Sequence, residues 1–491
     1  LDKLPWGYHP SRTQWSQSAS LPEREKHNSA LVQQALFDLQ SIIQQPTVYH
    51  QPIEKVQAFD LDDTLFRSEL SKIEAQSNTN TVVYFPDEDG KQIAFEVFEA
   101  NVFSRELSKK YPNIKSYRGV SVGNRGKRIH FSISPKGIQS MMTGRGEKGI
   151  LFMEKSIGQT YMLYNRKDHT AKDIGFICKT SPKLIEQLSS STAKLVDDQT
   201  LRRFRVAVAA SGEYTVFHGG TKAGALAAIN ATLTRVNSVF ERDLGVTLEL
   251  IGTTDEVIYT DASTDPFTGS LSSQTQNVLT SVLGEASYDI GHLFNQKDNT
   301  VDGNSGFIGS VCRDNRKGSA YTTFSSPQGD VFDIDLVAHE MGHQFGANHT
   351  FSHLSEGTSV QVEPASGTTI MGYAGITGVN NVASNSDDYF HYASILQIRE
   401  YLETVSCGET VALTNVPPVL NPVQNYIIPK TTPFVLMGDA SDPDPGDVIT
   451  CAWEQIDNGI ITQATFGPTS PTGAMFRSFA PTVAPERYFP K

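Results

Sequence analysis

One short stretch constrains the fold of this chain more than any other feature: residues 339–349, which read HEMGHQFGANH and hold three of the twelve histidines. Around it, the sequence has the spacing of an amphipathic helix from Asp333 to Phe345, with apolar residues at Ile334, Val337, Ala338, Met341 and Phe345. Residues four apart lie on the same face of a helix. The spacing therefore predicts that His339 and His343 project together and can bind one ion from the same side.

His349 can complete this group from outside the helix. It follows His343 by six residues and is out of phase with the helical face. Gly346 lies where the helix must stop and turn, which favours a residue that adopts positive φ. Three imidazoles would leave a tetrahedral Zn²⁺ with one open position, as a catalytic site needs. Glu340 adjoins the pair and can reach a zinc-bound water as a general base without displacing a ligand.

The pattern His-Glu-x-x-His-x-x-Gly-x-x-His followed by a methionine turn resembles the metzincin signature. The sequence from Thr369 to Tyr373, TIMGY, supplies the turn, and Met371 follows His349 by 22 residues. The resemblance implies a zinc-dependent endopeptidase that hydrolyses peptide bonds in protein substrates, with Glu340 activating the water. It also implies that Met371 forms an apolar floor beneath the metal.

Within the metzincins the chain looks most like the adamalysin/reprolysin group. The similarity lies in the segment GFIGSVC at 306–312 and in Cys407 after the last predicted helix. It implies a Cys312–Cys407 disulfide that closes a loop of about 95 residues.

Two features depart from the adamalysin pattern. Thr350 follows His349 where an Asp is common, and Tyr373 resembles a tyrosine of the astacin and serralysin groups. In those groups the tyrosine binds zinc or stabilises the oxyanion. The alternative, which we favour, is that Tyr373 is an aromatic wall of the pocket.

Substrate is expected to bind in an extended conformation. By the same resemblance, Gly306–Ser310 is the edge strand that pairs with the substrate backbone, a mode that tolerates many side chains. The stretch Tyr373–Gly378 is expected to line the pocket for the residue just past the scissile bond.

Cys178 is the candidate for a fourth, inhibitory ligand. The four cysteines form no Cys-x-x-Cys pair, which excludes zinc-finger and thioredoxin-type sites. A thiolate in the open zinc position would exclude water, and family members use such a cysteine switch in their propeptides. A buried free thiol and a disulfide with Cys451 are the alternatives. Activation would need cleavage between about Ser189 and Arg203, with Lys194, Arg202 and Arg203 as candidate sites.

The periodicities divide the chain into three predicted domains. Residues 1–198 are expected to form a mainly β inhibitory propeptide, 199–409 a metzincin catalytic domain with a twisted mixed sheet plus helices, and 418–491 a partial Ig-like β-sandwich. The elements predicted in the first domain are a helix at Ser29–Ile43 and strands at Thr81–Phe85, Ile93–Phe98, Ile129–Ile133, Ile150–Met153 and Tyr161–Tyr164. Those predicted in the second are strands at Arg205–Ala210 and Thr247–Ile251 and helices at Thr221–Leu244, Gln274–Leu283 and Ala393–Val405.

The composition limits the kinds of partner and the cellular location that we expect for this protein. The net charge of −13 and the pI near 5.4 argue against nucleic acid and anionic membranes. No apolar run of about 18 residues that could span a bilayer occurs. The chain begins Leu1-Asp2-Lys3 without a methionine, which fits removal of an export signal. We expect a secreted, extracellular monomer.

Three further interpretations compete with or extend this one. The sequence FDLDDTL at 59–65 matches the Asp-x-Asp-x-Thr motif of haloacid-dehalogenase-type phosphatases, but the residues before it are too polar for a buried parallel strand.

The acidic loop Asp439–Asp447 resembles those of polycystic-kidney-disease-like and cadherin-like modules and suits Ca²⁺, or is an ordinary solvated turn. A catalytically inert, zinc-containing adhesion or binding protein is the whole-chain alternative, against which the intact Glu340 argues.

Overall fold

The computed structural model of the chain describes residues 37–44, 47–48, 51–52, 55–75, 81–144, 149–156, 158–168, 175–184, 198–467 and 469–490. These residues divide into two compact units. The first unit spans the described residues from 37 to 168 except 102–112. The second unit contains residues 102–112 and everything described from 175 onwards.

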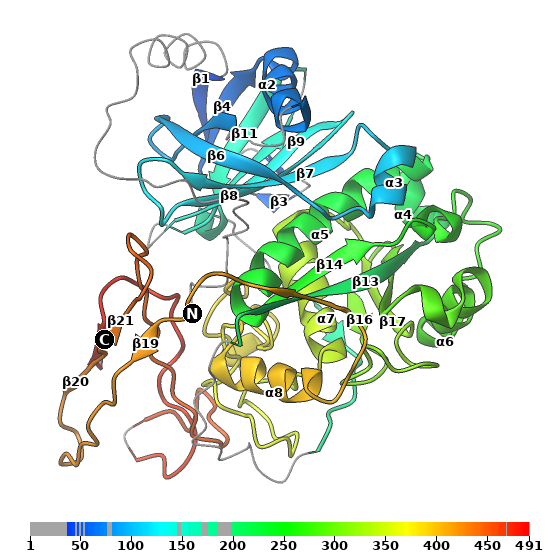
Figure 1. The fold of residues 1–491 in the computed structure, drawn as a ribbon. Coiled ribbons are helices and arrows are strands. Elements are labelled where there is room, and N and C mark those ends of the chain that lie inside the picture. Colours follow the sequence, from blue (N-terminus) through cyan, green and yellow to red (C-terminus); the bar gives the residue numbers. More distant parts are fainter. Residues whose placement is uncertain are drawn as a thin grey trace, which may run out of the picture. The chain divides into compact units, whose positions relative to one another are not determined.

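The first unit is built on a nine-stranded sheet in which every pair of neighbours is antiparallel (Figure 1). In spatial order the strands are β1 Phe37–Gln44, β4 Lys55–Leu61, β11 Thr160–Asn165, β10 Leu151–Lys155, β9 Gly137–Thr143, β8 Arg128–Ser134, β7 Lys115–Ser121, β6 Gln92–Ala100 and β5 Thr81–Pro86. The helix α2, Asp63–Ala75, contributes Phe66 to a core that includes Phe85 and Phe131. A two-stranded pair, β2 Thr47–Val48 and β3 Gln51–Pro52, lies outside this sheet. The five strands predicted in this region are confirmed.

The helix predicted at Ser29–Ile43 is wrong over residues 37–43, and its first part lies outside the described residues. Leu39 and Ile43 are four apart, which fits a helix. In the structure this segment pairs instead with β4, from Phe37 opposite Leu61 to Gln44 opposite Lys55. Its backbone hydrogen bonds therefore go to a neighbouring strand.

The first part of the phosphatase-like motif, Phe59–Leu61, lies at the end of a strand, but that strand is antiparallel and not the buried parallel strand that the polar residues argued against. The strand β4 is antiparallel to both neighbours and buries Val56, Phe59 and Leu61. Asp60 accepts a hydrogen bond from Thr160 at 2.7 Å. A phosphatase of that type needs parallel strands between helices, and this antiparallel sheet does not supply them.

The second unit contains a mixed sheet in the order β12-β16-β17-β15-β13-β14, with β18 paired to the first half of β13. The strands β13, β14, β15 and β17 are mutually parallel, whereas β16 runs antiparallel to β17. The bounds are β12 Ile177–Cys178, β13 Thr200–Ala210, β14 Val246–Leu250, β15 Ile290–Gln296, β16 Asp302–Asn304, β17 Ala320–Phe324 and β18 Glu409–Ala412. The helix α5, Lys222–Leu244, makes the crossover from β13 to β14 that parallel neighbours require. It lies beside the sheet in Figure 1.

Helices complete the unit and agree closely with the sequence prediction. Thr221 caps α5 by accepting a hydrogen bond from the Gly224 amide. The last predicted helix, α8, ends at Leu402 instead of Val405. The helical bounds are α3 Arg105–Lys110, α4 Gly212–Phe217, α6 Leu271–Val278, η3 Leu279–Leu283, η5 Val331–Ala338, α7 His339–Gln344 and α8 Tyr392–Leu402, with short turns η2 Thr254–Val257, η4 Glu285–Ser287 and η6 Gly378–Asn380. A further short turn, η1 Arg166–Asp168, belongs to the first unit. The predicted mixed sheet with helices is therefore confirmed.

The edge strand of this sheet is not the one predicted. Residues 306–310 turn away from the sheet, and Gly306 and Gly309 have φ values of 72° and 75°. The sheet ends on this side with β12, which pairs in parallel with the outer side of β16, Asp302–Asn304.

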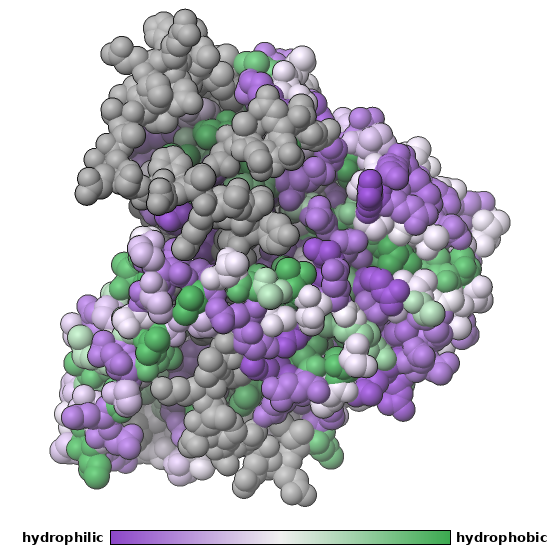
Figure 2. Space-filling view, viewed as in Figure 1, coloured by the Kyte–Doolittle hydropathy of each residue, from purple (hydrophilic) through white to green (hydrophobic). Residues whose placement is uncertain are grey.

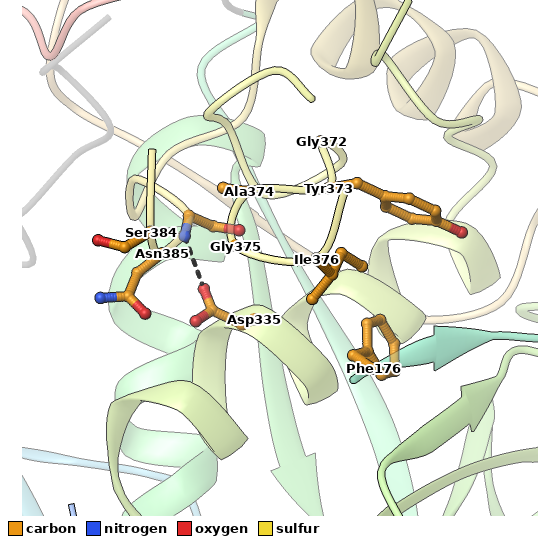
Figure 3. Close-up of a pocket in the computed structure, with 10 residues that line it drawn as sticks. Phe176, Asp335, Gly372, Tyr373, Ala374, Gly375, Ile376, Ser384 and Asn385 are labelled. Atoms are coloured by element: carbon orange, nitrogen blue, oxygen red, sulfur yellow. Dashed lines mark hydrogen bonds between the residues drawn. The ribbon is translucent and has the colours of Figure 1, made fainter. Parts of the chain in front are cut away.

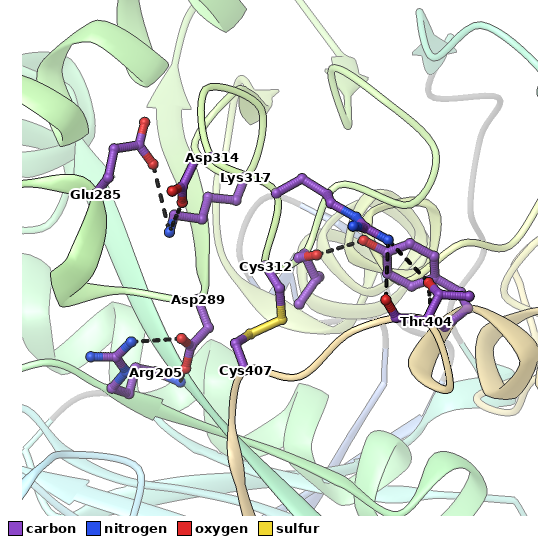
Figure 4. Close-up of a disulfide and its surroundings, with 11 residues drawn as sticks. Arg205, Glu285, Asp289, Cys312, Asp314, Lys317, Thr404 and Cys407 are labelled. Carbon is purple, nitrogen blue, oxygen red and sulfur yellow. Dashed lines mark hydrogen bonds and ion pairs between the residues drawn. A yellow bond between two sulfur atoms is a disulfide. The ribbon is translucent and has the colours of Figure 1, made fainter.

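The predicted Cys312–Cys407 disulfide is present, with a sequence separation of 95 residues (Figure 4). It joins the loop before the helix η5–α7 to the segment after α8. Ion pairs surround it: Arg205 with Asp289 at 2.7 Å, and Lys317 with Asp314 at 2.6 Å.

Replacing both Cys312 and Cys407 with serine is expected to lower the free energy of unfolding by about 4 kcal/mol, because a crosslink over so long a loop restricts the unfolded chain. Chemical denaturation measures the change. Cys451→Ser, which removes a thiol outside any disulfide, is the control. A double variant as stable as the parent would contradict the estimate.

Beyond residue 418 the described chain forms two separate two-stranded antiparallel sheets. They are β19 Val419–Leu420 with β21 Ala440–Ser441, and β20 Phe434–Met437 with β22 Glu486–Phe489. Trp453 is partly buried, and its indole nitrogen donates to the Pro485 carbonyl at 2.9 Å. An Ig-like sandwich stays a prediction.

The surface seen in Figure 2 mixes hydrophilic residues with small hydrophobic patches. None of the described helices has both the length and the apolar composition that crossing a membrane requires.

Candidate metal centre and active site

The predicted helix exists as a continuous run made of η5 and α7. Its first half is a π-helix, which the sequence did not predict. Phe345 anchors its end by packing edge-on against Phe240 of α5 and Phe204 of β13, with ring centroids 5.7 and 5.3 Å apart. Gly346 then turns with φ of 109°, as predicted. A Cβ at this position would lie 2.8 Å from Tyr401, so both the conformation and the space require glycine.

This turn brings the three histidines together. The Nε2 atom of His343 lies 3.2 Å from that of His339 and 3.0 Å from that of His349. All three side chains are buried.

The opposite nitrogen of each ring has an oxygen partner. His339 Nδ1 lies 2.7 Å from the Ile370 carbonyl and His343 Nδ1 lies 2.7 Å from the Ala347 carbonyl. A carbonyl oxygen only accepts, so these Nδ1 atoms carry the hydrogen. Burial lowers the pKa of His339 to about 3 and also lowers the pKa of His343 well below its ordinary value. Both rings are therefore neutral at neutral pH, with bare Nε2 lone pairs directed at one point.

A zinc ion fits this arrangement of donors. Zinc bound at about 2.0–2.1 Å by tetrahedrally placed imidazoles separates their nitrogens by roughly 3.3 Å. The 3.0 and 3.2 Å separations are close to that value. Lone pairs this near one another repel unless a cation lies between them, so His339, His343 and His349 would hold the metal.

Glu356 is a site residue that the sequence analysis missed. Both of its carboxylate oxygens lie 3.0 Å from His349 Nδ1, so the third histidine has a carboxylate partner where the other two have carbonyls. Such a partner fixes the ring and raises its basicity as a ligand. Glu356 lies in an irregular loop without periodicity, and no pattern could have singled it out.

Glu356→Gln is expected to weaken zinc binding by about 10- to 100-fold, the usual cost of removing a carboxylate behind a histidine ligand. Competition with a chromogenic chelator measures the affinity. Glu403→Gln, at a side chain that is 68% exposed, is the matched control. Equal affinities for the two variants would show that Glu356 has no such role.

A second missed carboxylate, Glu363, connects the third ligand to the methionine turn. It is fully buried and accepts hydrogen bonds from the Thr350 hydroxyl at 2.6 Å and the Thr368 amide at 2.8 Å, as well as from Thr369. Thr350 directly follows His349. Thr350, which stands where an Asp is common in the adamalysin pattern, thus donates its hydroxyl hydrogen to a buried glutamate.

Met371 is fully buried beneath the helix. Its carbonyl accepts from the Thr350 amide at 3.0 Å, and a Cβ on Gly342 would meet its sulfur at 2.6 Å. The side chain therefore lies against the helix that carries His339 and His343, where the resemblance places it.

Glu340 is completely buried beside this group. Its Oε2 accepts a hydrogen bond from the Thr180 hydroxyl at 2.9 Å. Its Oε1 has no hydrogen-bond partner among the described residues. Burial raises the pKa of Glu340 to about 8, against the effect of the bonds from Thr180 and Cys178. A Cβ on Gly303 of β16 would lie 2.4 Å from Oε1, so glycine lets the edge strand approach the carboxylate.

The segment around Cys178 lies along the edge of the sheet. Cys178 Sγ is 3.6 Å from His343 Nε2, and the four candidate ligand atoms all lie within 4.8 Å of one another. Phe176 packs edge-on against His339, with centroids 5.8 Å apart. Side chains two apart on an extended chain share a face, so Phe176, Cys178 and Thr180 all meet the site, whereas Ile177 is 59% exposed. That alternation is a signal from which Thr180 could have been predicted.

Neither Cys178 nor Cys451 is in a disulfide, so the alternative bridge between them is not formed. Burial, with Glu340 nearby, raises the pKa of the Cys178 thiol above its ordinary value.

A small cavity of about 20 Å³ is lined by Phe176 and Tyr373, whose rings pack against those of His339 and His349 respectively (Figure 3). Tyr373–Ile376 of the predicted stretch line it, whereas Thr377 and Gly378 do not. In Figure 3 the apolar residues Phe176 and Ile376 lie at one end, and Asp335, which accepts from the Ser386 amide at 3.1 Å, lies at the other.

Tyr373 has its ring centroid 4.6 Å from that of His349, and burial, with Cys178 next, raises its pKa above the ordinary value. Whether it acts on substrate or only forms a wall stays a prediction.

Residues 200–402 match the family described as Metallo-peptidase family M12B Reprolysin-like. A search among curated proteins finds no match. The matched range contains strands β13 to β17 of the mixed sheet, the three histidines and the methionine turn. This part of the chain is a reprolysin-type metzincin domain and thus belongs to a metallopeptidase family. Metallopeptidases of this family use zinc, and His339, His343 and His349 could bind it.

Proposed function

We propose that the protein is a secreted zinc endopeptidase that is held latent by its own N-terminal region and cleaves protein substrates. The observation that carries the proposal is the convergence of the three histidine Nε2 atoms beside a buried glutamate with one unpaired oxygen. A purely structural zinc site has no use for that glutamate.

In the proposed reaction, zinc would supply a Lewis acid that polarises the attacking water and the scissile carbonyl. Glu340 would accept a proton from the water at Oε1 and deliver it to the leaving amine nitrogen. The substrate backbone would pair with the outer edge of β16, the place that β12 takes in this structure. Tyr373–Ile376 would line the pocket for the residue beyond the scissile bond.

Latency would come from three neighbouring side chains. Cys178 would be the fourth zinc ligand in place of water. The Thr180 hydroxyl donates to Oε2 of Glu340, the proposed general base, and Phe176 lines the pocket. Processing between about Ser189 and Arg203 would release the segment.

Secretion is supported by the Cys312–Cys407 disulfide, since such bonds persist in oxidising compartments. Calcium binding stays a prediction of the acidic loop, where oxygens of Asp442, Asp444 and Asp447 lie within 4.8 Å of one another.

Removing the metal tests the proposal. The zinc-loaded protein, activated by limited trypsin treatment and freed of trypsin with a serine-protease inhibitor, is expected to degrade casein or gelatin. A chelator should abolish this activity and added zinc restore it. Zinc-replete, correctly cut protein that degrades neither substrate would favour the inert adhesion or binding protein.

A further inference from the structure

The loop that follows the third histidine has little regular structure of its own. Residues 350–367, here termed the ligand loop, run from His349 to the methionine turn and include Glu356 and Glu363. Among the described residues, one isolated bridge between Phe351 and Glu363 is the loop's only β-pairing. Something besides secondary structure must therefore hold it in place.

A segment far downstream bonds to both ends of the ligand loop. The Ile461 amide donates to the Ser352 carbonyl at 3.0 Å, and the Ala365 amide donates to the Ile461 carbonyl at 3.0 Å. The Ser352 amide in turn donates to the Ala365 carbonyl at 2.9 Å. The three backbones thus form a closed ring of hydrogen bonds, and the Ile461 side chain is 0% exposed.

The same segment contacts the middle of the loop. The Gly459 amide donates to the Gln361 carbonyl at 3.1 Å, and the Gln361 amide donates to Asn458 Oδ1 at 3.0 Å. These bonds lie between the two missed carboxylates, Glu356 and Glu363.

It also contacts the chain on the far side of the pocket. Glu454 accepts from the Tyr392 amide at 2.6 Å, and the Tyr389 hydroxyl donates to Ser478 at 2.9 Å. Residues 454–467 and 469–478, here termed the brace, therefore bond to the loops before and after the methionine turn.

We propose that the brace positions His349 and its partner Glu356, so that the working metal site extends beyond the family match, which ends at residue 402. The inference rests on the proposed function. Ligands must be held to within about 0.5 Å for productive geometry, and an irregular loop reaches that precision only through its contacts. The brace is thus a positioning element of the metal site as well as a C-terminal extension of the fold.

The test uses the full chain with two neighbouring isoleucines. Ile461→Ala removes a buried side chain at the ring of hydrogen bonds, whereas Ile460→Ala changes one that is 39% exposed. Ile461→Ala is expected to raise the zinc dissociation constant about tenfold, as loss of support behind a ligand does. It should also speed amide exchange in residues 350–367 and alter the visible spectrum of the Co²⁺ form. Ile461→Val should restore the zinc affinity, the amide exchange and the Co²⁺ spectrum to those of the parent. Ile460→Ala should match the parent in all three measurements.

Parental zinc affinity, exchange and Co²⁺ spectrum in Ile461→Ala, with only a lower melting temperature, would overturn the proposal. Should Ile461→Ala fail to fold, Asn458→Ala removes one bond to Gln361 and decides by the same measurements. None of these readouts needs peptide hydrolysis. A parent protein that binds zinc but hydrolyses nothing would therefore refute the proposed function without affecting this test.

Discussion

Glu340→Gln is expected to lower peptide hydrolysis by about 10³- to 10⁴-fold, the upper part of the range for a lost general base. Glutamine keeps the shape of the side chain and can still accept from Thr180, but it cannot take a proton from water. Because Glu340 is not among the four clustered ligand atoms, zinc should stay bound at one ion per chain. Steady-state kinetics of the processed protein and metal analysis measure the two effects.

Glu403→Gln, at the exposed end of α8, should keep parental activity. A Glu340→Gln variant with activity within about tenfold of the parent would remove Glu340 from its proposed role. Loss of zinc together with activity would instead place the residue among the determinants of metal binding.

Cys178→Ala is expected to make the unprocessed chain active, by at least about tenfold over the parent, a change that needs only about 1.4 kcal/mol. The alanine leaves the fourth position near His343 to water. Thr180 would still donate to Glu340, so the variant should remain less active than the processed protein. Adding Thr180→Val should raise the activity of the unprocessed chain further.

The measurement is hydrolysis of a quenched fluorescent casein by chains whose full length is verified before and after the assay. Cys451→Ala, at the other free thiol, is the control and should stay latent. If the Cys178→Ala variant is as inactive as the parent, the proposed inhibitory role of Cys178 is wrong.

The convergence of the three histidines could be predicted because their placement depends on short-range rules. His339 and His343 are one helical turn apart, and Gly346 is required by the turn that returns His349. The strands and helices around β13 and α5 follow local periodicity in the same way, so their predicted bounds lie within a few residues of the observed ones. The resemblance supplied the Cys312–Cys407 pair, which spacing alone would have left open.

The supporting residues could not be predicted because they lie in loops. Glu356 and Glu363 meet His349 and Thr350 through an irregular path of backbone turns. Ile461 reaches the same loop from about 100 residues away. No periodic pattern encodes such contacts.

The edge strand predicted at residues 306–310 came from the resemblance and is wrong, because two glycines with positive φ interrupt an extended chain there. In β4 the argument from polar residues excluded only a buried parallel strand, and antiparallel neighbours tolerate such residues on one face.

The two-residue alternation of Phe176, Cys178 and Thr180 has a consequence for how latency is encoded. If the segment slid along β16 by one residue, Ile177 or Lys179 would face the histidines, and neither carries a thiol. A shift by two residues would place Phe176 or Thr180 at the histidines, and neither of these carries a thiol. Under the proposed function, only one register of the segment would place the Cys178 thiol at the metal. An insertion or deletion in the chain next to residues 176–180 that changes this register should therefore release activity, even when every residue of the segment is intact.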